Sequence, residues 1–480
     1  MTRKQLLING EWRDASDGAT MPVINPATEE VIALVAAATR DDVDAAVAAA
    51  RAAFEGPWGQ MPARERGRLL WKLAERLTEQ IDEVARLETL HNGKPITESR
   101  HVEIPMAAEC LQYFAGWADK IEGDTIPVKS GALVYTRREP LGVVAAIVPW
   151  NFPLLLAMWK VAPALAAGNT VILKPASQTP LTALALGQLA IDVGLPPGVL
   201  NVITGSGSRT GQALVEHPGV NKIAFTGDTS TGKGIMRTAA ETIKHITLEL
   251  GGKSPNIVFA DADLDAALRG ATVGIFYGKG EVCAAGSRLL VDKAIKNEFI
   301  DKLAARTKKM VAGDPLDPKT RLGAISSKSQ LERVLGYVDI AKQEGATLVA
   351  GGARTDIGTG KGFFMQPTVF ADVTPQMTIA REEIFGPVLA AIDFMDVDEA
   401  IARANDTVYG LAAGVWTRDI KKAHYVASKL QAGLVWVNTY NVYDTAAPFG
   451  GYKQSGFGRE MSKYALDSYT QIKTVWVDLN

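Results

Sequence analysis

Residues 141–150 read LGVVAAIVPW, an uncharged run with the length of a buried strand. Three similar runs follow along the chain: NTVILKP at 169–175, VLNVITG at 199–205 and KIAFTG at 222–227. Each run leads into a Gly, Pro or Ser/Thr cluster and then into an amphipathic segment. Because short apolar runs that alternate with helix-like segments are typical of a parallel, doubly wound sheet, we predict an α/β fold.

The sequence on either side of these runs predicts two further regions. Residues 40–95 carry apolar side chains at helical spacing, which indicates helices that end near Gly93. A second α/β region begins near Gly251, with short apolar runs at 256–259 and 287–291. A chain of 480 residues also exceeds the size at which one hydrophobic core stops growing, so two or three domains are expected.

The last segment, YTQIKTVWVDLN at 469–480, alternates like a strand with an exposed face. Ile472, Thr474 and Trp476 fall on one side of it. An unpaired strand edge of this kind finds a partner strand, and another subunit could supply it.

Composition excludes several classes of function. The 51 Lys plus Arg residues nearly balance the 53 Asp plus Glu residues, so nothing favours a nucleic acid or an anionic membrane as partner, and a small molecule is the better expectation. With only Cys110 and Cys283, a disulfide framework and a cysteine-rich metal site are excluded. The stretch MTRKQLLINGEWRDASDG at 1–18 lacks the apolar core of a secretory leader, so we expect a cytoplasmic protein.

Three motifs carry residues suited to nucleophilic catalysis, each with a structural alternative. Cys283, in GKGEVCAAGSRLLV, has small neighbours that would let a substrate carbon reach the sulfur, although a single cysteine is more often a buried small hydrophobe. Glu249, before the double glycine of LELGGKSP, is either a salt-bridged structural group or a general base of raised pKa. Asn151, between the prolines of PWNFP, is either a rigid oxyanion donor or a turn-forming residue.

Seven motifs occur in a fixed order along the chain: PWNFP, LKPASQTP, AFTGDTSTG, LELGGKSP, EVCAAGSR, EEIFGPV and PFGGYKQSGFGRE. In this order and spacing the sequence resembles the aldehyde dehydrogenase superfamily over essentially the whole chain. The 34 residues from Glu249 to Cys283 look like the family's spacing between general base and nucleophile. The resemblance is to the hydrolytic, non-acylating, NAD(P)-dependent type, because the coenzyme-A-acylating relatives typically lack a carboxylate matched to Glu249.

This resemblance implies an enzyme that oxidises an aldehyde to the carboxylic acid. The Cys283 thiolate would attack the aldehyde carbon to form a thiohemiacetal, and the Asn151 amide with the Cys283 backbone N–H would hold the oxyanion. Hydride transfer would leave a thioester, which a water activated by Glu249 would hydrolyse. Glu460, in the family's GRE position, would relay the proton.

The fold implied by the resemblance has a Rossmann-type dinucleotide-binding domain, an α/β catalytic domain and a small strand-based oligomerisation region. We expect the first in residues 1–118 and 141–251, the second in 252–455, and the third in 119–140 and 456–480. The family habit is a homodimer or homotetramer.

The cofactor implied is NADP or NAD. Positions that match the family's cofactor contacts, including the glycine-rich turns of GSGSRTG and AFTGDTSTG, are Trp150, Lys174, Ser177, Gly207, Gly211, Phe225, Thr226, Gly227, Thr229, Gly232, Leu250, Glu383 and Phe385. Asp228 departs from the small hydroxyl residue expected of the family there, and we expect it to cap the following helix instead.

Ser177 bears on the choice between the two cofactors. NAD-preferring members often carry at this place a glutamate that binds both ribose hydroxyls. Such a glutamate would repel a 2′-phosphate by about 4 kcal/mol per charge pair at 4 Å in an effective dielectric near 20. Because serine removes that repulsion, we expect NADP to be accepted, with Lys174 contacting its phosphate.

The substrate tunnel implied by the family is lined at Trp159, Tyr277, Val282, Ala284 and the segment 441–447. Aromatic walls favour apolar or aryl aldehydes, although they could also surround a cationic amine with Asp444 or Glu281 as counter-charge, and Lys279 could bind an acidic substrate. Glu281 replaces the family's usual glutamine, and we expect it to point away from Cys283. The five histidines are scattered without ligand-like spacing, so no metal is expected.

Two other classes of function compete with this interpretation. A structural or binding module could keep the fold, but it need not retain Cys283, Glu249 and Asn151 together. A thioester hydrolase could use Cys283 and Glu249 without redox chemistry, but the two glycine-rich turns favour a dinucleotide.

Overall fold

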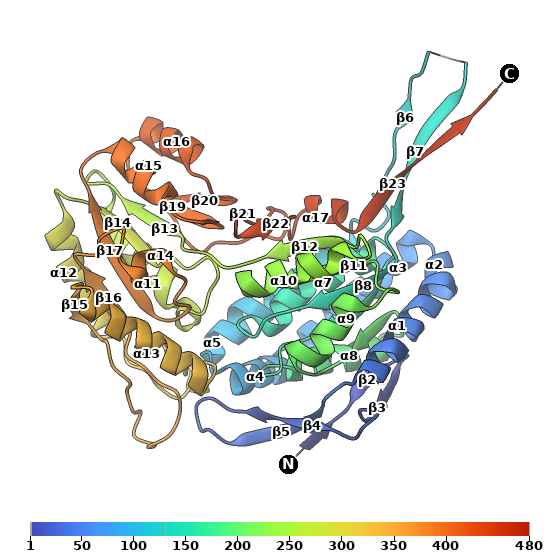
Figure 1. Cartoon of the computed structure of the whole chain (residues 1–480), viewed down its shortest axis with the longest axis horizontal. Helices are drawn as coiled ribbons and strands as arrows, with labels where there is room; N and C mark the ends of the chain where they lie inside the picture. Colours follow the sequence, from blue (N-terminus) through green and yellow to red (C-terminus); the bar gives the residue numbers. More distant parts are fainter. Residues whose placement is uncertain (1, 130, 480) are drawn as a thin grey trace.

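The computed structural model describes residues 2–129 and 131–479, which form two large sheets and a protruding arm (Figure 1). The first sheet has eight strands. In spatial order they are β22 (Gly456–Phe457), β12 (His245–Glu249), β11 (Lys222–Thr226), β8 (Val143–Ile147), β9 (Thr170–Lys174), β10 (Leu200–Val202), β2 (Leu6–Ile8) and β3 (Glu11–Arg13).

The four apolar runs between residues 141 and 227 form strands in the parallel centre of this sheet. The chain enters at β8, adds β9 and β10 on one side, and then crosses over to add β11 and β12 on the other. All residues of β8, β9, β10 and β11 are buried, as expected for strands covered on both faces. The predicted doubly wound sheet is confirmed, and its strand order reverses between β8 and β11, where such sheets bind ligands outside the carboxyl ends of the strands.

Helices cover both faces of the first sheet. The most deeply placed is α7 (Pro153–Ala166), which begins at a proline suited to a first helical position and is buried along its whole length. The predicted helical region 40–95 is confirmed, and its last helix ends at Gly93 in the left-handed conformation, with φ of 84°. The other helices of this part are α1 (Arg40–Glu55), α2 (Pro57–Gln60), α3 (Ala63–Glu79), α4 (Ile81–Asn92), α5 (Ile96–Glu98), η1 (Ser99–Glu103), α6 (Ile104–Ala115), α8 (Leu181–Asp192), η2 (Gly207–Gly211), α9 (Gln212–Glu216) and α10 (Thr229–Ala240).

The second large sheet is built from the C-terminal half of the chain. Its strands in spatial order are β15 (Thr347–Ala350), β16 (Thr368–Ala371), β17 (Val388–Phe394), β14 (Arg288–Asp292), β13 (Pro255–Val258), β19 (Ala412–Trp416) and β20 (Leu434–Val437). Only the β15–β16 pair is antiparallel. The helices of this part are α11 (Leu264–Phe276), η3 (Tyr277–Gly280), α12 (Lys296–Thr307), α13 (Lys328–Gln343), α14 (Thr378–Arg381), α15 (Val397–Asn405) and α16 (Ile420–Lys429), whereas α17 (Tyr464–Asp467) lies at the base of the arm against α7 and β23.

The arm consists of β6 (Thr125–Ile126), β7 (Leu133–Pro140) and β23 (Thr470–Val477), and Figure 1 shows it projecting from the body with the C-terminus near its end. The strand predicted from the alternation at 469–480 is therefore present. β23 pairs with β7 of the same chain from Thr470 to Val477, so this partner strand does not come from another subunit. The opposite edge of β23 has no strand beside it in the described chain.

The C-terminal segment returns to the first sheet before it enters the arm. β22 pairs with β12, so that Gly456 lies opposite Glu249. The Leu250 N–H donates to the Ser455 carbonyl at 3.0 Å, and the Ser455 hydroxyl donates to the Gly251 carbonyl at 2.6 Å. Hydrogen bonds with Ser455 thereby hold Leu250 and Gly251, in the segment that connects the two sheets.

Smaller elements complete the fold. They are the sheet of β1 (Thr2–Lys4), β5 (Val31–Ala36) and β4 (Thr20–Ile24), and the pair β18 (Tyr409–Gly410) and β21 (Tyr452–Lys453). Within residues 2–129 and 131–479, no helix combines the length and the apolar character needed to cross a bilayer.

Candidate active site

A cleft opens where three parallel strands of the first sheet end. The segments after β8, β11 and β12 meet there with groups contributed by the second sheet's half of the chain. The lining residues are Pro149, Trp150, Asn151, Thr226, Gly227, Asp228, Glu249, Leu250, Gly251, Cys283, Gln330, Arg333, Glu383 and Phe385. The three candidate catalytic residues, far apart in sequence, are thus brought together at the edge of the sheet where ligands are expected.

Cys283 lies in the turn between η3 and β14 and retains some exposure, whereas Cys110 is fully buried. Loss of solvent raises the pKa of the Cys283 thiol well above its ordinary value, and the nearby Glu249 carboxyl raises it further. The Cys283 carbonyl comes so close to Gly252 that a Cβ placed there would lie 2.3 Å from that oxygen. The second glycine of the double-glycine turn therefore allows the segment that carries Glu249 to touch the segment that carries Cys283.

Glu249 is the last residue of β12, and only 2% of it is exposed. Both carboxyl oxygens are buried without a hydrogen-bond partner in the described chain. Desolvation raises the pKa of this carboxyl to about 8, against the opposing charge of Lys160. A buried carboxyl that lies close to the nucleophilic thiol suits a general base that takes its proton from an incoming water.

Glu460 reaches the same region through Lys160. The Lys160 ammonium, fully buried on α7, donates to Glu460 Oε1 at 2.9 Å and to Thr226 Oγ1 at 2.7 Å. The charges of both residues act on Glu249. Lys160 was missed by the sequence analysis, because a lysine within an apolar helix carries no motif of its own.

The Asn151 side chain is held in one direction. Its Nδ2 donates to the Glu281 carbonyl at 2.9 Å, which leaves the second N–H of the amide free, while Oδ1 is buried without a partner in the described chain. Its backbone carbonyl accepts from Lys94 Nζ at 2.7 Å. Asn151 is therefore more than a turn-forming residue, since its amide is fixed and offers a free donor.

Glu383 and Phe385 form another wall of the cleft. The Phe385 ring meets the Trp150 ring edge to face, with centroids 5.2 Å apart. Glu383 Oε1 accepts from the Gly252 N–H at 2.9 Å, and desolvation raises the pKa of its carboxyl to about 7.

Two residues of α13 support this wall and were not found from the sequence. Gln330 Nε2 donates to the Phe385 carbonyl at 2.7 Å, and an Arg333 amino group donates to the Glu383 carbonyl at 3.2 Å. They lie about 50 positions before their partners, and no motif links the two segments.

The remaining cofactor candidates lie around the cleft rather than in it. Lys174 lies beside Gly211, and its ammonium donates to the Pro175 carbonyl at 3.1 Å. Desolvation lowers the pKa of Lys174 to about 8. The other candidates outside the cleft lining are Ser177, Gly207, Phe225, Thr229 and Gly232.

Asp228 caps α10, as expected from the sequence. Its carboxylate accepts from the backbone N–H groups of Ser230 at 2.8 Å and of Thr231 at 3.1 Å. A pyrophosphate at this helix start would therefore meet N–H groups that already have an acceptor.

The groups around the cleft fit a dinucleotide in other respects. Thr229 Oγ1 is a buried hydroxyl without a partner in the described chain, and the Glu383 carboxyl faces the cleft beside Gly251. Ribose hydroxyls or phosphate oxygens would satisfy such groups, and the Trp150 and Phe385 rings, packed edge to face, add apolar surface to the wall of the cleft.

The substrate-pocket candidates Trp159, Tyr277, Val282 and Ala284 are not among the residues that line this cleft. Trp159 is packed against Phe449 and Tyr443, with ring centroids 5.3 and 6.4 Å away. Tyr277 stacks on Phe152 at 6.3 Å. Val282 and Ala284 flank the nucleophile, and both are buried.

Glu281 points away from the thiol, as expected from the sequence, and is paired instead with Lys279. The ammonium and carboxylate are 2.8 Å apart, and each side chain is 1% exposed. This pairing corrects two expectations, because neither the Lys279 charge nor the Glu281 charge is free to meet a substrate.

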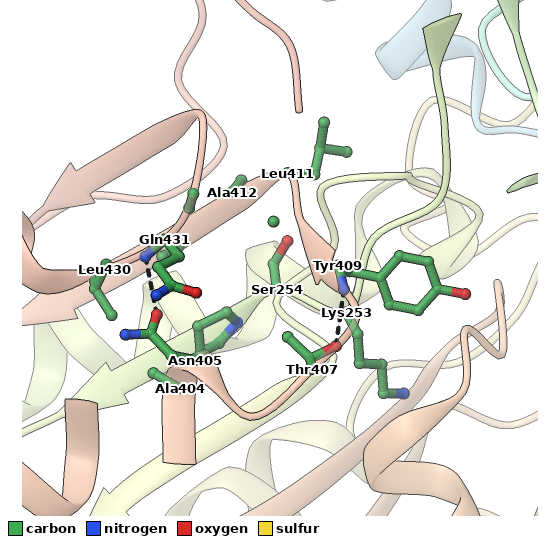
Figure 2. A pocket seen from close by; sticks show the side chains of 14 residues that line it. Lys253, Ser254, Ala404, Asn405, Thr407, Tyr409, Leu411, Ala412, Leu430 and Gln431 are labelled. Carbon is green, nitrogen blue, oxygen red and sulfur yellow. Dashed lines mark hydrogen bonds between the residues drawn. The ribbon is translucent and has the colours of Figure 1, made fainter. Parts of the chain in front are cut away.

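A second, smaller pocket is lined in part by the residues that follow the double glycine. Figure 2 shows it between Lys253, Ser254 and Leu411, with Asn405 hydrogen-bonded to Gln431 at its far side. Its volume of about 10 Å³ leaves room for one water and excludes an organic substrate. Among residues 2–129 and 131–479 no cluster of three or more His, Cys, Asp or Glu side chains is placed to hold a metal ion.

Known proteins resemble this chain along nearly its whole length. A model of the aldehyde dehydrogenase family matches residues 12–475. Human mitochondrial aldehyde dehydrogenase is 50% identical over 476 residues, which cover 98% of this chain and 92% of the human one. The NAD⁺ complex of Bacillus cereus aldehyde dehydrogenase has a TM-score of 0.98 at 51% identity, covering 100% of this chain and 97% of that one. An indole-3-acetaldehyde dehydrogenase solved with NAD⁺ has a TM-score of 0.98 at 46% identity, covering 100% and 97%.

The approach of Gly252 to Cys283 gives a direct test of the site geometry. Replacing Gly252 with alanine should lower kcat by about 100-fold, because the added Cβ displaces the nucleophile's carbonyl and a shift near 1 Å is enough for such a loss. The measurement is steady-state kinetics beside a melting curve. Gly336→Ala is the matched control, since a Cβ there meets nothing within 4 Å and should leave kcat unchanged. Wild-type activity of Gly252→Ala would show that this close approach is not required.

Proposed function

The chain belongs to the aldehyde dehydrogenase family, and from this premise we propose how its own residues oxidise an aldehyde to the carboxylic acid with a nicotinamide dinucleotide. The observation that carries the proposal is the convergence of Cys283, Glu249 and Asn151 in one cleft with Glu383 and Phe385. Each of the three has a group left available for reaction: a partly exposed thiol, an unpaired carboxyl and a free amide N–H.

Cys283 acts as the nucleophile. The partly exposed Cys283 thiol gives its proton to water in the cleft, and the thiolate sulfur then forms a bond to the aldehyde carbon while the carbonyl electron pair moves to the oxygen. The free N–H of Asn151 and the Cys283 backbone N–H hold that oxyanion. The nicotinamide, when bound, supplies the acceptor for the hydride, and Glu383 and Phe385 would hold it beside the thiol.

Glu249 then acts as the general base. It takes a proton from a water that attacks the thioester carbon, the C–S bond breaks, and the carboxylic acid leaves Cys283 free. The proton can pass from Glu249 towards Lys160 and Glu460, whose charges act on it and which are linked at 2.9 Å. The raised pKa of Glu249 keeps it basic enough for this role near neutral pH.

Glu249→Gln tests these roles. We expect a burst of reduced cofactor near one equivalent per site, followed by a steady rate lowered about 100-fold, because acylation remains while the thioester is hydrolysed slowly. In the wild type, the steady rate should rise with pH and level off above about 8, where Glu249 is ionised. Stopped-flow absorbance measures both, and Cys283→Ala should show no burst. A Glu249→Gln enzyme that turned over normally would contradict the assignment of Glu249 as the general base.

The cofactor is NADP or NAD, and we propose that NADP is accepted well. Ser177 is uncharged, and its hydroxyl donates to the Gln178 side chain at 3.2 Å. Lys174 is buried, which lowers its pKa to about 8, and a phosphate beside it would stabilise the charged form of its ammonium.

Ser177→Glu should weaken NADP binding by about three orders of magnitude while NAD binding is kept, because the new carboxylate repels only the 2′-phosphate. Titration of the protein fluorescence with each cofactor gives both dissociation constants, and Ser177→Gln is the uncharged control of the same size. Retention of NADP affinity in Ser177→Glu would refute this placement of the phosphate.

We propose apolar or aryl aldehydes as the substrate class. Trp159, Tyr443 and Phe449 form a continuous aromatic cluster, and Tyr277 lies over Phe152. Lys279 and Glu281, which precede the nucleophile in sequence, neutralise each other, so neither offers a site for a charged substrate tail. The indole-3-acetaldehyde dehydrogenase is a structural neighbour with an aryl substrate.

We propose that residues 1–118 and 141–251 are the dinucleotide-binding domain, 252–455 the catalytic domain, and 119–140 with 456–480 the oligomerisation region. The strand composition of the two sheets and the arm supports this division, with β22 as the one strand that returns to the first sheet. We also propose a cytoplasmic location, because both cysteines are free thiols and one of them serves the reaction.

We propose that the arm joins subunits into a homodimer or homotetramer. Ile472 and Trp476 on β23 are 63% and 61% exposed, and Leu133 on β7 is also exposed. Large apolar side chains on a strand with an open edge are a poor surface for a monomer but a good one for a second copy.

The double substitution Ile472→Glu and Trp476→Glu should shift the protein to a smaller species without unfolding it, because it places charges on the proposed contact. Size-exclusion chromatography with light scattering measures the mass. Met395→Glu is the control, since Met395 is 71% exposed but lies away from the arm. A wild-type protein that is monomeric, or a variant whose mass is unchanged, would contradict the proposal.

A further inference from the structure

The turn that precedes the nucleophile is strained and tightly packed. Gly278, Lys279 and Gly280 all have left-handed backbone angles, with φ of 55°, 62° and 71°. This conformation costs a lysine about 1–2 kcal/mol, a penalty that glycine would not incur. A Cβ on Gly280 would lie 2.3 Å from the Gly386 carbonyl, next to Phe385. The surroundings therefore hold Lys279 in a conformation that it would not adopt alone.

The buried Lys279–Glu281 ion pair closes this turn. Lys279 Nζ lies 2.8 Å from Glu281 Oε2, and Glu281 Oε1 accepts from the Ser326 N–H at 3.0 Å. Burial lowers the pKa of Lys279 and raises the pKa of Glu281, and the charge of each partner opposes the shift of the other. Neither residue of the pair lines the cleft, so the reaction described above does not use their charges.

The pair is linked to Asn151 from both sides. The first link is the backbone of Glu281, whose carbonyl accepts a hydrogen bond from the Asn151 side-chain amide at 2.9 Å. The second link runs through Asn92 to the segment that carries Asn151. Lys279 Nζ donates to the Asn92 carbonyl and to Asn92 Oδ1, both at 2.8 Å. Asn92 Nδ2 in turn donates to the Trp150 carbonyl at 2.7 Å.

We propose that Lys279 and Glu281 are positioning residues, whose ion pair fixes the Glu281 carbonyl and thereby the orientation of the Asn151 amide. A carbonyl oxygen accepts only, so it keeps Nδ2 towards itself and Oδ1 away. One N–H of Nδ2 is anchored on Glu281, and the other is left for the substrate oxygen. If the turn relaxes, the amide is free to rotate, and Oδ1 can then take the place of the donor and repel the oxyanion.

This inference rests on the role of Asn151 in the proposed function, so its test must separate the two. The test compares the burst rate of reduced cofactor, at saturating aldehyde and cofactor, in the wild type, Glu281→Gln, Asn151→Ala and the combination of both. Glu281→Gln leaves the Lys279 charge buried without its partner, and we expect the burst to slow by about 10- to 100-fold, a part of what losing an oxyanion donor costs. Cofactor affinity, measured by fluorescence titration, should stay within about twofold because the pair does not line the cleft.

The double-mutant cycle distinguishes positioning from general stability. In the Asn151→Ala background, Glu281→Gln should slow the burst no further, because the amide through which it acts is gone. The neutral double variant Lys279→Gln with Glu281→Gln should recover a burst within about fivefold of the wild type, since it strands no charge and keeps hydrogen-bonding side chains. If Glu281→Gln alone does not fold, this neutral variant and Lys279→Gln give the same comparison.

Four results would overturn the inference. If the combined variant loses the product of the two single-variant losses in burst rate, the ion pair acts on the reaction independently of Asn151. A neutral double variant as slow as Glu281→Gln would show that charge pairing is not what holds the turn. A wild-type burst in Glu281→Gln would show that the pair does not matter to the amide. A wild-type burst in Asn151→Ala would instead remove the proposed role of Asn151, and this inference with it.

Discussion

The hydrogen bond from the Asn151 amide to the Glu281 carbonyl crosses the boundary between the two large sheets, and the site depends on that boundary being held still. Asn151 and Glu249 come from strand ends of the first sheet, whereas Cys283 comes from a turn that leads into the second. Neither sheet alone contains the reacting set. A relative shift of the sheets by about 1 Å would separate nucleophile and donor, at a cost of about two orders of magnitude in rate.

The boundary contains buried polar groups in places that ordinarily favour apolar side chains. Lys160, Lys279, Glu281 and Glu249 are each at most 2% exposed. Three of them have partners of opposite charge, but both oxygens of Glu249 lack a hydrogen-bond donor within the described chain. An unsatisfied buried group costs about 1–3 kcal/mol of stability. The fold therefore loses stability at Glu249, where the carboxyl is needed to activate the attacking water beside the thiol. This is the pattern expected where function competes with stability.

Much of this arrangement could be predicted from the sequence, because the runs and turns that form it are local. The parallel sheet follows from its apolar strands, Asp228 caps its helix as its position suggests, and ordered motifs bring Cys283, Glu249 and Asn151 to one place. Contacts between segments with no shared motif could not be predicted. Gln330 and Arg333 support Glu383 and Phe385 from a helix earlier in the chain, and Lys160 meets Glu460 across 300 positions. From the sequence, Lys279 and Glu281 were each candidates to bind a charged substrate. The sequence shows that both side chains are charged but not that they pair with each other.

The return of the chain end to the first sheet has a consequence for how the protein is made. β12 carries Glu249 at its end, and one of its two neighbours is β22, which begins only at Gly456. On the ribosome, residues up to 249 can form most of the first sheet long before this strand exists. The outer edge of β12 then stays unpaired until almost the whole chain has been translated. The edge of β12 is thus completed late in synthesis. A product truncated before Gly456 would contain both Glu249 and Cys283 but would lack the strand that pairs with β12.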